Sequence, residues 1–262
     1  SDPNLAFGAT VYPIMASFGD FLLIPYHCQK TPLPVRSVGN QACLAGNNAW
    51  LPTTTRLNPL DGAMQHARLA QQITFLLEVE KLKGILRATK PVGLERRENS
   101  AEHSWHIALC AILLAEHANQ PVDLLHVVKM LLIHDIVEID AGDTPAFGLV
   151  DAALQHANEQ RAADRLFNLL PADQAAELMA LWHEFEQRSS AEAKFAHAVD
   201  RLLPPLQNYY GAGGTWVEYQ ATLDRVLRRM QPVADGSTTL WDFVQRLLDD
   251  AVAQGLIAPT AG

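Results

Sequence analysis

The chain has 262 residues, a formal net charge of −9 and a hydrophobic content of 48%, which supplies enough apolar sequence for a core and too much for a disordered acidic chain. No apolar run approaches the roughly 20 residues that a membrane helix requires, and the negative charge argues against a protein that holds a nucleic-acid polymer. The three cysteines form no Cys-x-x-Cys pair, and the first residues lack the pattern of a secretory signal. We therefore expect a cytoplasmic protein without a membrane segment.

Residues 1–63 differ in composition from the rest of the chain. They contain no glutamate, their three aspartates are balanced by three basic residues, and they hold seven of the 15 prolines. Because proline interrupts both helices and sheet ladders, we predict a largely irregular N-terminal extension whose most packable part is 18–26. We assign this extension no function and place the functional domain at 64–262, which carries the whole net charge.

From residue 64 onward, apolar residues recur at helical spacing. Asn99 or Ser100 can cap one helix, with Glu102 in its first turn, and we expect the sixth helix to end at Pro204-Pro205 because proline breaks a helix interior. No segment shows the alternation of a strand, so we predict an all-α globule. The predicted helices cover 64–87, 99 or 100 to about 114, 122–138, 151–170, 172–188, 189–203, 216–231 and 238–254.

Several polar side chains fall where an apolar residue is expected. His134 and Asp135 end the most apolar helix, Glu138 follows His134 by one turn, and His103 and Asp200 lie on the inner stripes of two other helices. Burying imidazole and carboxylate groups costs free energy unless they are paired or bind a cation. Two imidazoles and two carboxylates suit a divalent transition metal or Mg²⁺, and their long spacings exclude a zinc finger and favour a site assembled between helices.

Each of these residues also has a structural interpretation. A buried histidine is commonly a hydrogen-bonded core residue, and Asp200 could cap a helix or pair with Arg201. On spacing alone, His106 is as suitable a ligand as His103. The residues alone therefore do not decide between a metal centre and paired core side chains.

Three segments, taken in order, resemble the HD-domain metal-dependent phosphohydrolases: RRENSAEHSWHIAL, LLIHDIVEIDAGDTP and SSAEAKFAHAVDRL. The resemblance runs from about Leu76 to Leu203 and is strongest to the branch that includes the 5′-deoxynucleotidases, which release phosphate from deoxynucleoside monophosphates. It implies a helical HD-domain fold, a small phosphate ester as substrate, most simply a (deoxy)nucleoside 5′-monophosphate, and a homodimer.

The resemblance also implies four ligands for one divalent metal ion, and it selects His103 rather than His106. Such a ligand set accepts several divalent ions, so the ion could be Mn, Co, Mg, Zn or Fe. A bound ion would lower the pKa of water and offset charge on the phosphoryl group. The implied ligands are His103, His134, Asp135 and Asp200.

The same resemblance assigns the remaining site residues. Glu138 is implied to help activate water, Asp143 to contact the substrate sugar, and Arg87 to bind the phosphate through its planar fork of donors. In the nucleotidase branch a tryptophan usually follows this arginine, whereas Ala88 and Thr89 follow it here. This departure supports an alternative, an HD phosphohydrolase that acts on nucleoside triphosphates or on non-nucleotide phosphates.

Two further alternatives remain open. His156 and His183 lie between the His-Asp pair and the last ligand, where a two-metal HD enzyme has extra histidines, although the position of His183 beside Trp182 favours solvent. The other alternative is a non-catalytic sensor that binds a metal or a nucleotide without releasing phosphate.

Overall fold

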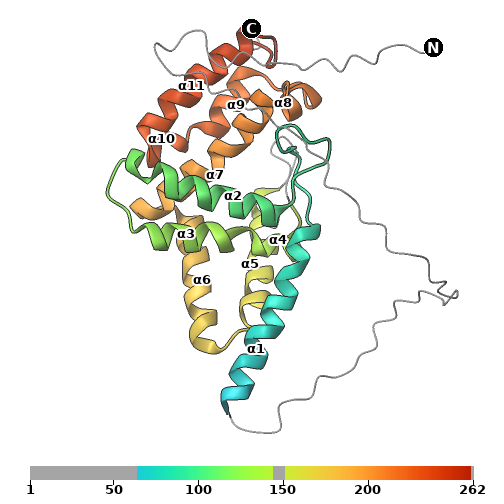
Figure 1. Cartoon of the computed structure of the whole chain (residues 1–262), viewed down its shortest axis with the longest axis vertical. Coiled ribbons are helices and arrows are strands. Elements are labelled where there is room, and N and C mark those ends of the chain that lie inside the picture. Colours follow the sequence, from blue (N-terminus) through green and yellow to red (C-terminus); the bar gives the residue numbers. More distant parts are fainter. Residues whose placement is uncertain (1–63, 144–150, 261–262) are drawn as a thin grey trace, which may run out of the picture. The chain divides into compact units, whose positions relative to one another are not determined.

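The computed structural model describes residues 64–143 and 151–260, and Figure 1 shows them as helices joined by loops. The α-helices are α1 (Met64–Val79), α2 (Ser100–Leu114), α3 (Leu124–Ile133), α4 (Glu138–Ala141), α5 (Ala152–Phe167), α6 (Ala172–Gln187), α7 (Ala191–Tyr210), α8 (Gly214–Glu218), α9 (Leu223–Met230), α10 (Val233–Gly236) and α11 (Thr238–Ala253). The 3-10 helices are η1 (Glu80–Gly84), η2 (Ala115–His117) and η3 (His134–Val137).

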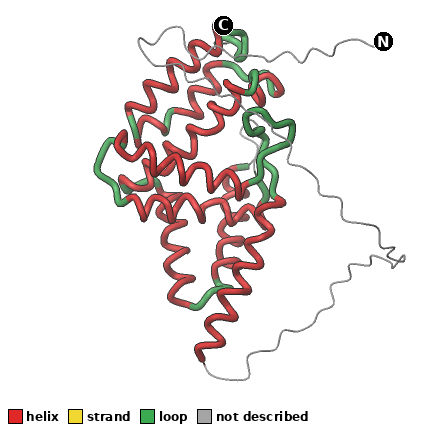
Figure 2. The backbone as a smooth tube through the Cα atoms, viewed as in Figure 1, coloured by secondary structure: helices red, strands yellow, loops and turns green. Residues whose placement is uncertain are grey.

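The described ranges contain no strand (Figure 2), so the predicted all-α fold is confirmed. None of the helices in these ranges combines the length and the apolar character that a bilayer crossing demands. The extension predicted at 1–63 lies outside the described residues, as does most of the gap predicted after the third helix.

The start of α2 is fixed by a capping box at Asn99, one of the two caps that the sequence predicts. The side chain of Asn99 accepts a hydrogen bond from the backbone N–H of Glu102 at 3.0 Å, and the Glu102 carboxylate accepts one from the Asn99 N–H at 2.8 Å. Two otherwise unpaired helix donors are thereby satisfied, which typically stabilises a helix by about 1 kcal/mol. This cap fixes the helical register of His103, one turn into α2.

A short backbone ladder holds the segment before α2 against the end of η1. The N–H of Arg87 donates to the carbonyl of Glu98 at 2.8 Å, the N–H of Glu98 donates to Thr89 at 2.9 Å, and Ser100 donates to Ile85 at 3.0 Å. Because these residues are otherwise in loops, the ladder is what places Arg87 beside Glu98 and the start of α2.

The single helix predicted at 122–138 is divided into three. It begins as α3, tightens into the 3-10 turn η3 at His134 and continues as the short α4 from Glu138. A 3-10 turn within a helical run commonly marks a functional position. Leu131 belongs to one hydrophobic core and Ile136 to the other, so His134 and Asp135 lie where the two cores meet.

The predicted end of the sixth helix is wrong, because α7 continues through Pro204 and Pro205 to Tyr210. Each proline removes a helical hydrogen bond at a cost of about 3 kcal/mol. That cost is offset by burial on both sides of the prolines, for example of Leu203 and Gln207. Helix α7 packs against α2, α3, α6, α8, α10 and α11, and this packing keeps the helix intact.

Candidate metal centre and its pocket

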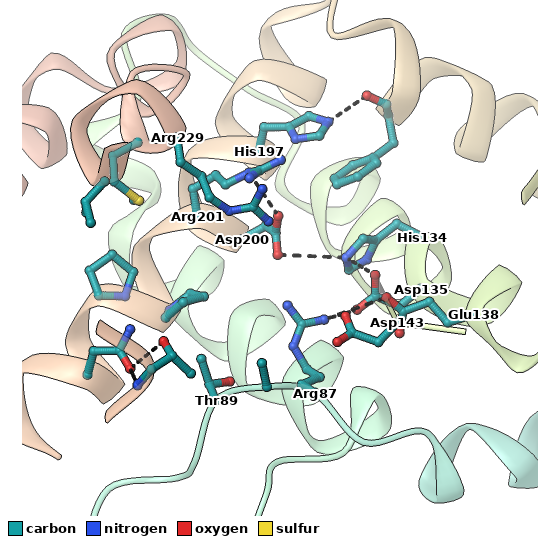
Figure 3. A pocket seen from close by; sticks show the side chains of 18 of the residues that line it. Arg87, Thr89, His134, Asp135, Glu138, Asp143, His197, Asp200, Arg201 and Arg229 are labelled. Atoms are coloured by element: carbon teal, nitrogen blue, oxygen red, sulfur yellow. Dashed lines mark hydrogen bonds and ion pairs between the residues drawn. The ribbon is translucent and has the colours of Figure 1, made fainter. Parts of the chain in front are cut away.

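A pocket of about 300 Å³ opens between α7, α9 and the η3–α4 turn (Figure 3). Its volume is at the lower end of the range for small-molecule sites. Six of the seven predicted site residues line it, and the seventh, His103, is fully buried and contacts Asp200, which does line it. The six residues that line it are Arg87, His134, Asp135, Glu138, Asp143 and Asp200.

Three of the four predicted ligands come together from α2, η3 and α7. The Nε2 atom of His103 lies 3.0 Å from Oδ1 of Asp200, and Nε2 of His134 lies 4.0 Å from the same oxygen. One ligand atom from each residue lies within 4.8 Å of the other two. Neighbouring ligands of an octahedral ion are about 3 Å apart when each bond is about 2.1 Å, so this group could hold a divalent metal ion.

The fourth predicted ligand, Asp135, lies beside this group. Its Oδ1 atom is 2.9 Å from Nε2 of His134, and its Oδ2 atom accepts a hydrogen bond from Nη1 of Arg87 at 2.9 Å. One carboxylate oxygen therefore faces the histidines while the other holds Arg87.

Hydrogen bonds on the far side of each imidazole turn the Nε2 atoms toward the centre. The Nδ1 atom of His134 donates to the carbonyl of Leu131 at 2.9 Å, and Nδ1 of His103 is 3.2 Å from Oε2 of Glu98. Partners of this kind orient metal-binding histidines and fix their tautomer. Both rings are buried, so their orientation is set by the protein rather than by solvent.

The electrostatics of this group favour a positive charge. Burial alone would lower the pKa of His134, but the charges of Asp135 and Asp200 raise it to about 9. Burial would likewise raise the pKa of Asp200, yet the hydrogen bond with His103 and the charge of His134 hold it well below its usual range. A centre that binds protons this strongly has a donor set that fits a divalent cation.

Glu138 lies next to this centre in the same pocket. Its Oε2 atom accepts a hydrogen bond from the hydroxyl of Ser100 at 2.6 Å, and its Oε1 atom is 4.0 Å from Nη1 of Arg87. The pKa of Glu138 is raised, first because its carboxyl is buried and then because Asp135 is close. A carboxyl group that readily takes up a proton is suited to acid–base work.

Arg87 and Asp143 line the same pocket beside these acids. The Arg87 side chain is only 15% exposed and also lies 3.6 Å from the Glu98 carboxylate. Burial raises the pKa of the Asp143 carboxyl. Ala88 and Thr89, which follow Arg87 in the sequence, also line the pocket. Their small side chains stand where the nucleotidase branch usually has a tryptophan.

Glu98 is a site residue that the sequence analysis did not find. It is 2% exposed, and its carboxylate accepts hydrogen bonds from Thr89 at 3.3 Å and from Gln207 at 2.6 Å in addition to its contact with His103. Its position just before the helix cap Asn99 resembles that of an ordinary solvated acid. Only the three-dimensional contacts reveal that it holds His103.

A model of the HD domain family matches residues 79–241. The chain belongs to the HD domain family. Among curated proteins it is similar to 5′-deoxynucleotidase HDDC2 of Bos taurus, 33% identical over 138 residues, and of Homo sapiens, 30% identical over 137 residues. The alignments cover 50% of this chain and 65% and 66% of those proteins, so the chain spans just under two thirds of the length of these relatives.

Among solved structures, the chain is similar to a predicted metal-dependent phosphohydrolase from Magnetospirillum magnetotacticum MS-1. The two are 49% identical with a TM-score of 0.71, and the match covers 75% of this chain and 99% of that one. The PH0347 protein of Pyrococcus horikoshii OT3 is 22% identical with a TM-score of 0.51, over 68% of this chain and 98% of that chain. This second similarity shows that the two proteins share the HD-domain fold.

Within this HD domain, the alternative ligands lie apart from the three grouped residues. His106 packs against Trp105, with ring centroids 5.8 Å apart, and is not among the described residues that line the pocket. His183 contacts Trp182 and is partly buried, rather than solvent-exposed as predicted. His156 stacks on the other side of Trp182 and approaches two carboxylates instead, so a second group that could hold a metal is formed by His156, Glu159 and Glu186.

Proposed function

We propose that this HD-domain protein is a metal-dependent phosphohydrolase that releases phosphate from nucleoside 5′-monophosphates, including deoxynucleotides. The observation that carries the proposal is the arrangement of a buried His-His-Asp group, an acid–base carboxyl and an arginine in one small pocket. The similarity to proteins named 5′-deoxynucleotidase supports the choice of substrate.

The four proposed ligands would hold one divalent ion at the end of the pocket where α2, η3 and α7 meet: His103, His134, Asp135 and Asp200. A divalent ion supplies a lower pKa for water and stabilises charge on the phosphoryl group. The protein's own contribution is to orient both imidazoles through Glu98 and the Leu131 carbonyl. This preorganisation means that the ligands need little rearrangement to bind the ion.

The remaining residues carry out the chemistry of phosphate-ester hydrolysis. Glu138 takes a proton from the attacking water, and the nearby charge of Arg87 favours the ionised carboxylate that this step requires. Arg87 binds two phosphate oxygens through its guanidinium fork and stabilises their charge as the ester bond breaks. Asp143 accepts a hydrogen bond from a sugar hydroxyl and so positions the leaving oxygen. The products are a nucleoside and inorganic phosphate.

The test is a phosphate-release screen of the purified protein on nucleoside and deoxynucleoside mono-, di- and triphosphates, with Mn, Co, Mg, Zn and Fe(II) added separately. We expect release from monophosphates that depends on the metal and stops when a chelator is added. Release from triphosphates or from non-nucleotide phosphates alone would replace the proposed substrate. Nucleotide binding without release on any substrate would identify a sensor instead.

One observation favours a substrate other than a simple monophosphate. The two residues that follow Arg87 in the pocket, Ala88 and Thr89, have small side chains. Because no tryptophan follows Arg87, hydrolysis of triphosphates or of non-nucleotide phosphates is the second candidate. The same screen ranks the two candidates by their kcat/KM values.

We further propose that the protein acts in the cytoplasm as a homodimer. The free thiol of Cys110 and the nucleotide substrate support a reducing, cytoplasmic location. The outward face of α2 exposes Trp105, Ile112 and Leu113, which are 63%, 52% and 65% accessible, and an apolar face of this kind suits a second copy of the chain. Sedimentation of the protein and of a Leu113→Glu variant tests this, because we expect the variant to be monomeric.

A further inference from the structure

Two arginines lie across the pocket from Arg87. Arg201 follows the proposed ligand Asp200 on α7, and Arg229 lies near the end of α9. Figure 3 shows both guanidinium groups on the side of the pocket opposite Arg87, with Asp200 between the two sides. Neither arginine belongs to the residues that the HD motifs assign to the metal or to the scissile phosphate.

Arg201 is incompletely paired. Its Nε atom is buried and has no hydrogen-bond partner, and the nearest carboxylate oxygen, Oδ2 of Asp200, is 3.8 Å away. The other oxygen of that carboxylate is already in contact with His103. Arg201 therefore keeps donors that no carboxylate saturates.

Arg229 has even fewer partners. In the part of the chain that the structure describes, no hydrogen bond or ion pair joins its side chain to another residue. Arg229 remains exposed to solvent, and partial desolvation by the protein, followed by the positive charge of Arg201, lowers its pKa to about 10. Two like charges therefore converge on one pocket without a full set of counter-charges.

Such an arrangement leaves donors of both side chains available to an anion in the pocket. Holding guanidinium groups close together costs Coulomb energy, whereas the planar fork of an arginine donates two hydrogen bonds to a phosphate. We infer that Arg201 and Arg229 form a second phosphate-binding subsite, so that a nucleotide with a second phosphate binds more tightly than the corresponding monophosphate. The substrate assignment rests on the proposed phosphohydrolase function.

Apolar side chains, which we call the apolar wall, line the same pocket as this subsite and the metal centre. Pro204, Trp216 and Met230 line the pocket on the same helices as, or next to, the two arginines. The wall suits the organic part of a nucleotide, while Asp200 and Arg201, as consecutive residues, keep the two phosphates near each other. The second phosphate is bound and not transferred: water displaces only the ester oxygen of the phosphate at Arg87.

Calorimetry on metal-loaded protein tests the subsite, with a Glu138→Gln background to slow turnover. The probes are adenosine 5′-monophosphate, adenosine 5′-diphosphate and adenosine 3′,5′-bisphosphate. We expect at least one two-phosphate probe to bind about 10- to 100-fold more tightly than the monophosphate, as the loss or gain of a charge-assisted contact predicts. Tighter binding of adenosine 5′-diphosphate would show that the two phosphates are linked directly. Tighter binding of the 3′,5′-bisphosphate would show that the second phosphate is attached elsewhere on the sugar.

Variants then assign the gain to the two arginines. Arg229→Gln should reduce the affinity ratio of the two-phosphate probe to the monophosphate to nearly one, and Arg229→Lys should restore part of it. Arg201→Gln should have the same effect with an unchanged melting temperature. The matched control is Arg228→Gln, because Arg228 is exposed on the same helix and pairs with Asp224 at 2.8 Å, and this variant should keep the full ratio.

Equal binding of one- and two-phosphate probes by the parent protein would overturn the subsite, as would an unchanged ratio in both Arg229→Gln and Arg201→Gln. These outcomes are separable from failure of the proposed function. Absence of phosphate release from every nucleotide, with the affinity ratio intact, would reject the hydrolase and leave the subsite standing. Release of phosphate from monophosphates, together with equal binding of one- and two-phosphate probes, would support the hydrolase and reject the subsite.

Discussion

The two sides of the pocket differ in whether their charged groups have partners within the protein. On one side, which we call the metal wall (His103, His134, Asp135, Glu138 and Asp200), each charged or titratable group contacts a partner inside the protein. On the other side, the arginine wall (Arg188, Arg201 and Arg229), Arg201 and Arg229 lack hydrogen-bond partners in the described ranges. Paired groups hold a fixed geometry before anything binds, whereas unpaired groups gain their partners from a ligand.

The largest expected effect comes from removing a charge from the metal wall. Asp200→Asn should lose the bound metal and reduce phosphate release by about 10³-fold or more, because a metal supplies several kcal/mol of transition-state stabilisation. Elemental analysis and initial rates measure the two effects. Asp249→Asn, on the exposed face of α11, is the control, and full metal content in Asp200→Asn would contradict the proposed ligand set.

The next effect separates acid–base chemistry from metal binding within the same wall. Glu138→Gln keeps the shape of the side chain and should lower kcat by about 10²-fold while the metal content is unchanged. Asp140→Asn is a matched control, because Asp140 is exposed on the same short helix and pairs with Arg165. A Glu138→Gln variant with normal turnover would remove Glu138 from the mechanism.

A smaller effect is expected from changing Glu98, which contacts His103 of the metal wall. Glu98→Gln keeps a hydrogen-bond acceptor for His103 but removes the buried charge that orients it, so metal affinity should fall by about 10- to 100-fold. Competition with a chelator of known affinity measures this change. Glu95→Gln, at an exposed position in the same loop, should leave the affinity unchanged. If both variants bind metal equally well, Glu98 has only a structural role.

Two buried histidines sharpen the comparison, because their pKa values move in opposite directions. Carboxylates raise the pKa of His134, whereas burial and the charge of Arg188 lower the pKa of His197 to about 3. His197 is therefore neutral when folded, and the unfolded chain takes up a proton below about pH 6.5. The neutral His197 side chain therefore contributes to the free energy of unfolding above pH 6.5, and this contribution is lost progressively as the pH falls toward 3.

This linkage amounts to about 2 kcal/mol of unfolding free energy at pH 5. His197→Gln should remove that component, so the difference in urea stability between pH 7.5 and pH 5 should shrink by about this amount. His66→Gln, at an exposed position of α1, should keep the difference seen in the unmodified protein. Identical pH dependence in all three proteins would show that His197 does not carry the acid sensitivity.

The metal wall was predictable because its residues violate a local pattern. His134, Asp135 and Asp200 are polar groups in apolar helical stripes, and such violations can be read from a single segment of sequence. A helix cap at Asn99 or Ser100 was predictable because capping partners lie within three residues of each other, and the structure selects Asn99. The structure groups His103, His134 and Asp200 as expected, and metal binding by them stays a prediction.

The features that the sequence did not predict depend on contacts between segments that are far apart in the chain. Glu98 meets Gln207 across 109 positions of sequence, and Ser100 meets Glu138 across 38, so no local pattern could identify them. The arginine wall escaped notice because an exposed arginine such as Arg229 looks like any solvated residue in the sequence. The end of α7 was mispredicted because packing on both sides of Pro204 outweighs the local preference of proline.

The direct succession of Asp200 and Arg201 on α7 has an evolutionary consequence. Consecutive residues of a helix point about 100° apart. One turn of α7 therefore contributes Asp200 to the metal wall and Arg201 to the arginine wall. Substitutions at 229 can therefore alter which phosphate esters are accepted without touching the metal ligands, whereas a substitution at 201 also removes the ion pair with Asp200. An insertion or deletion within α7 ahead of this pair would rotate Asp200 and Arg201 together, so a shift in helical register would move a metal ligand along with the subsite.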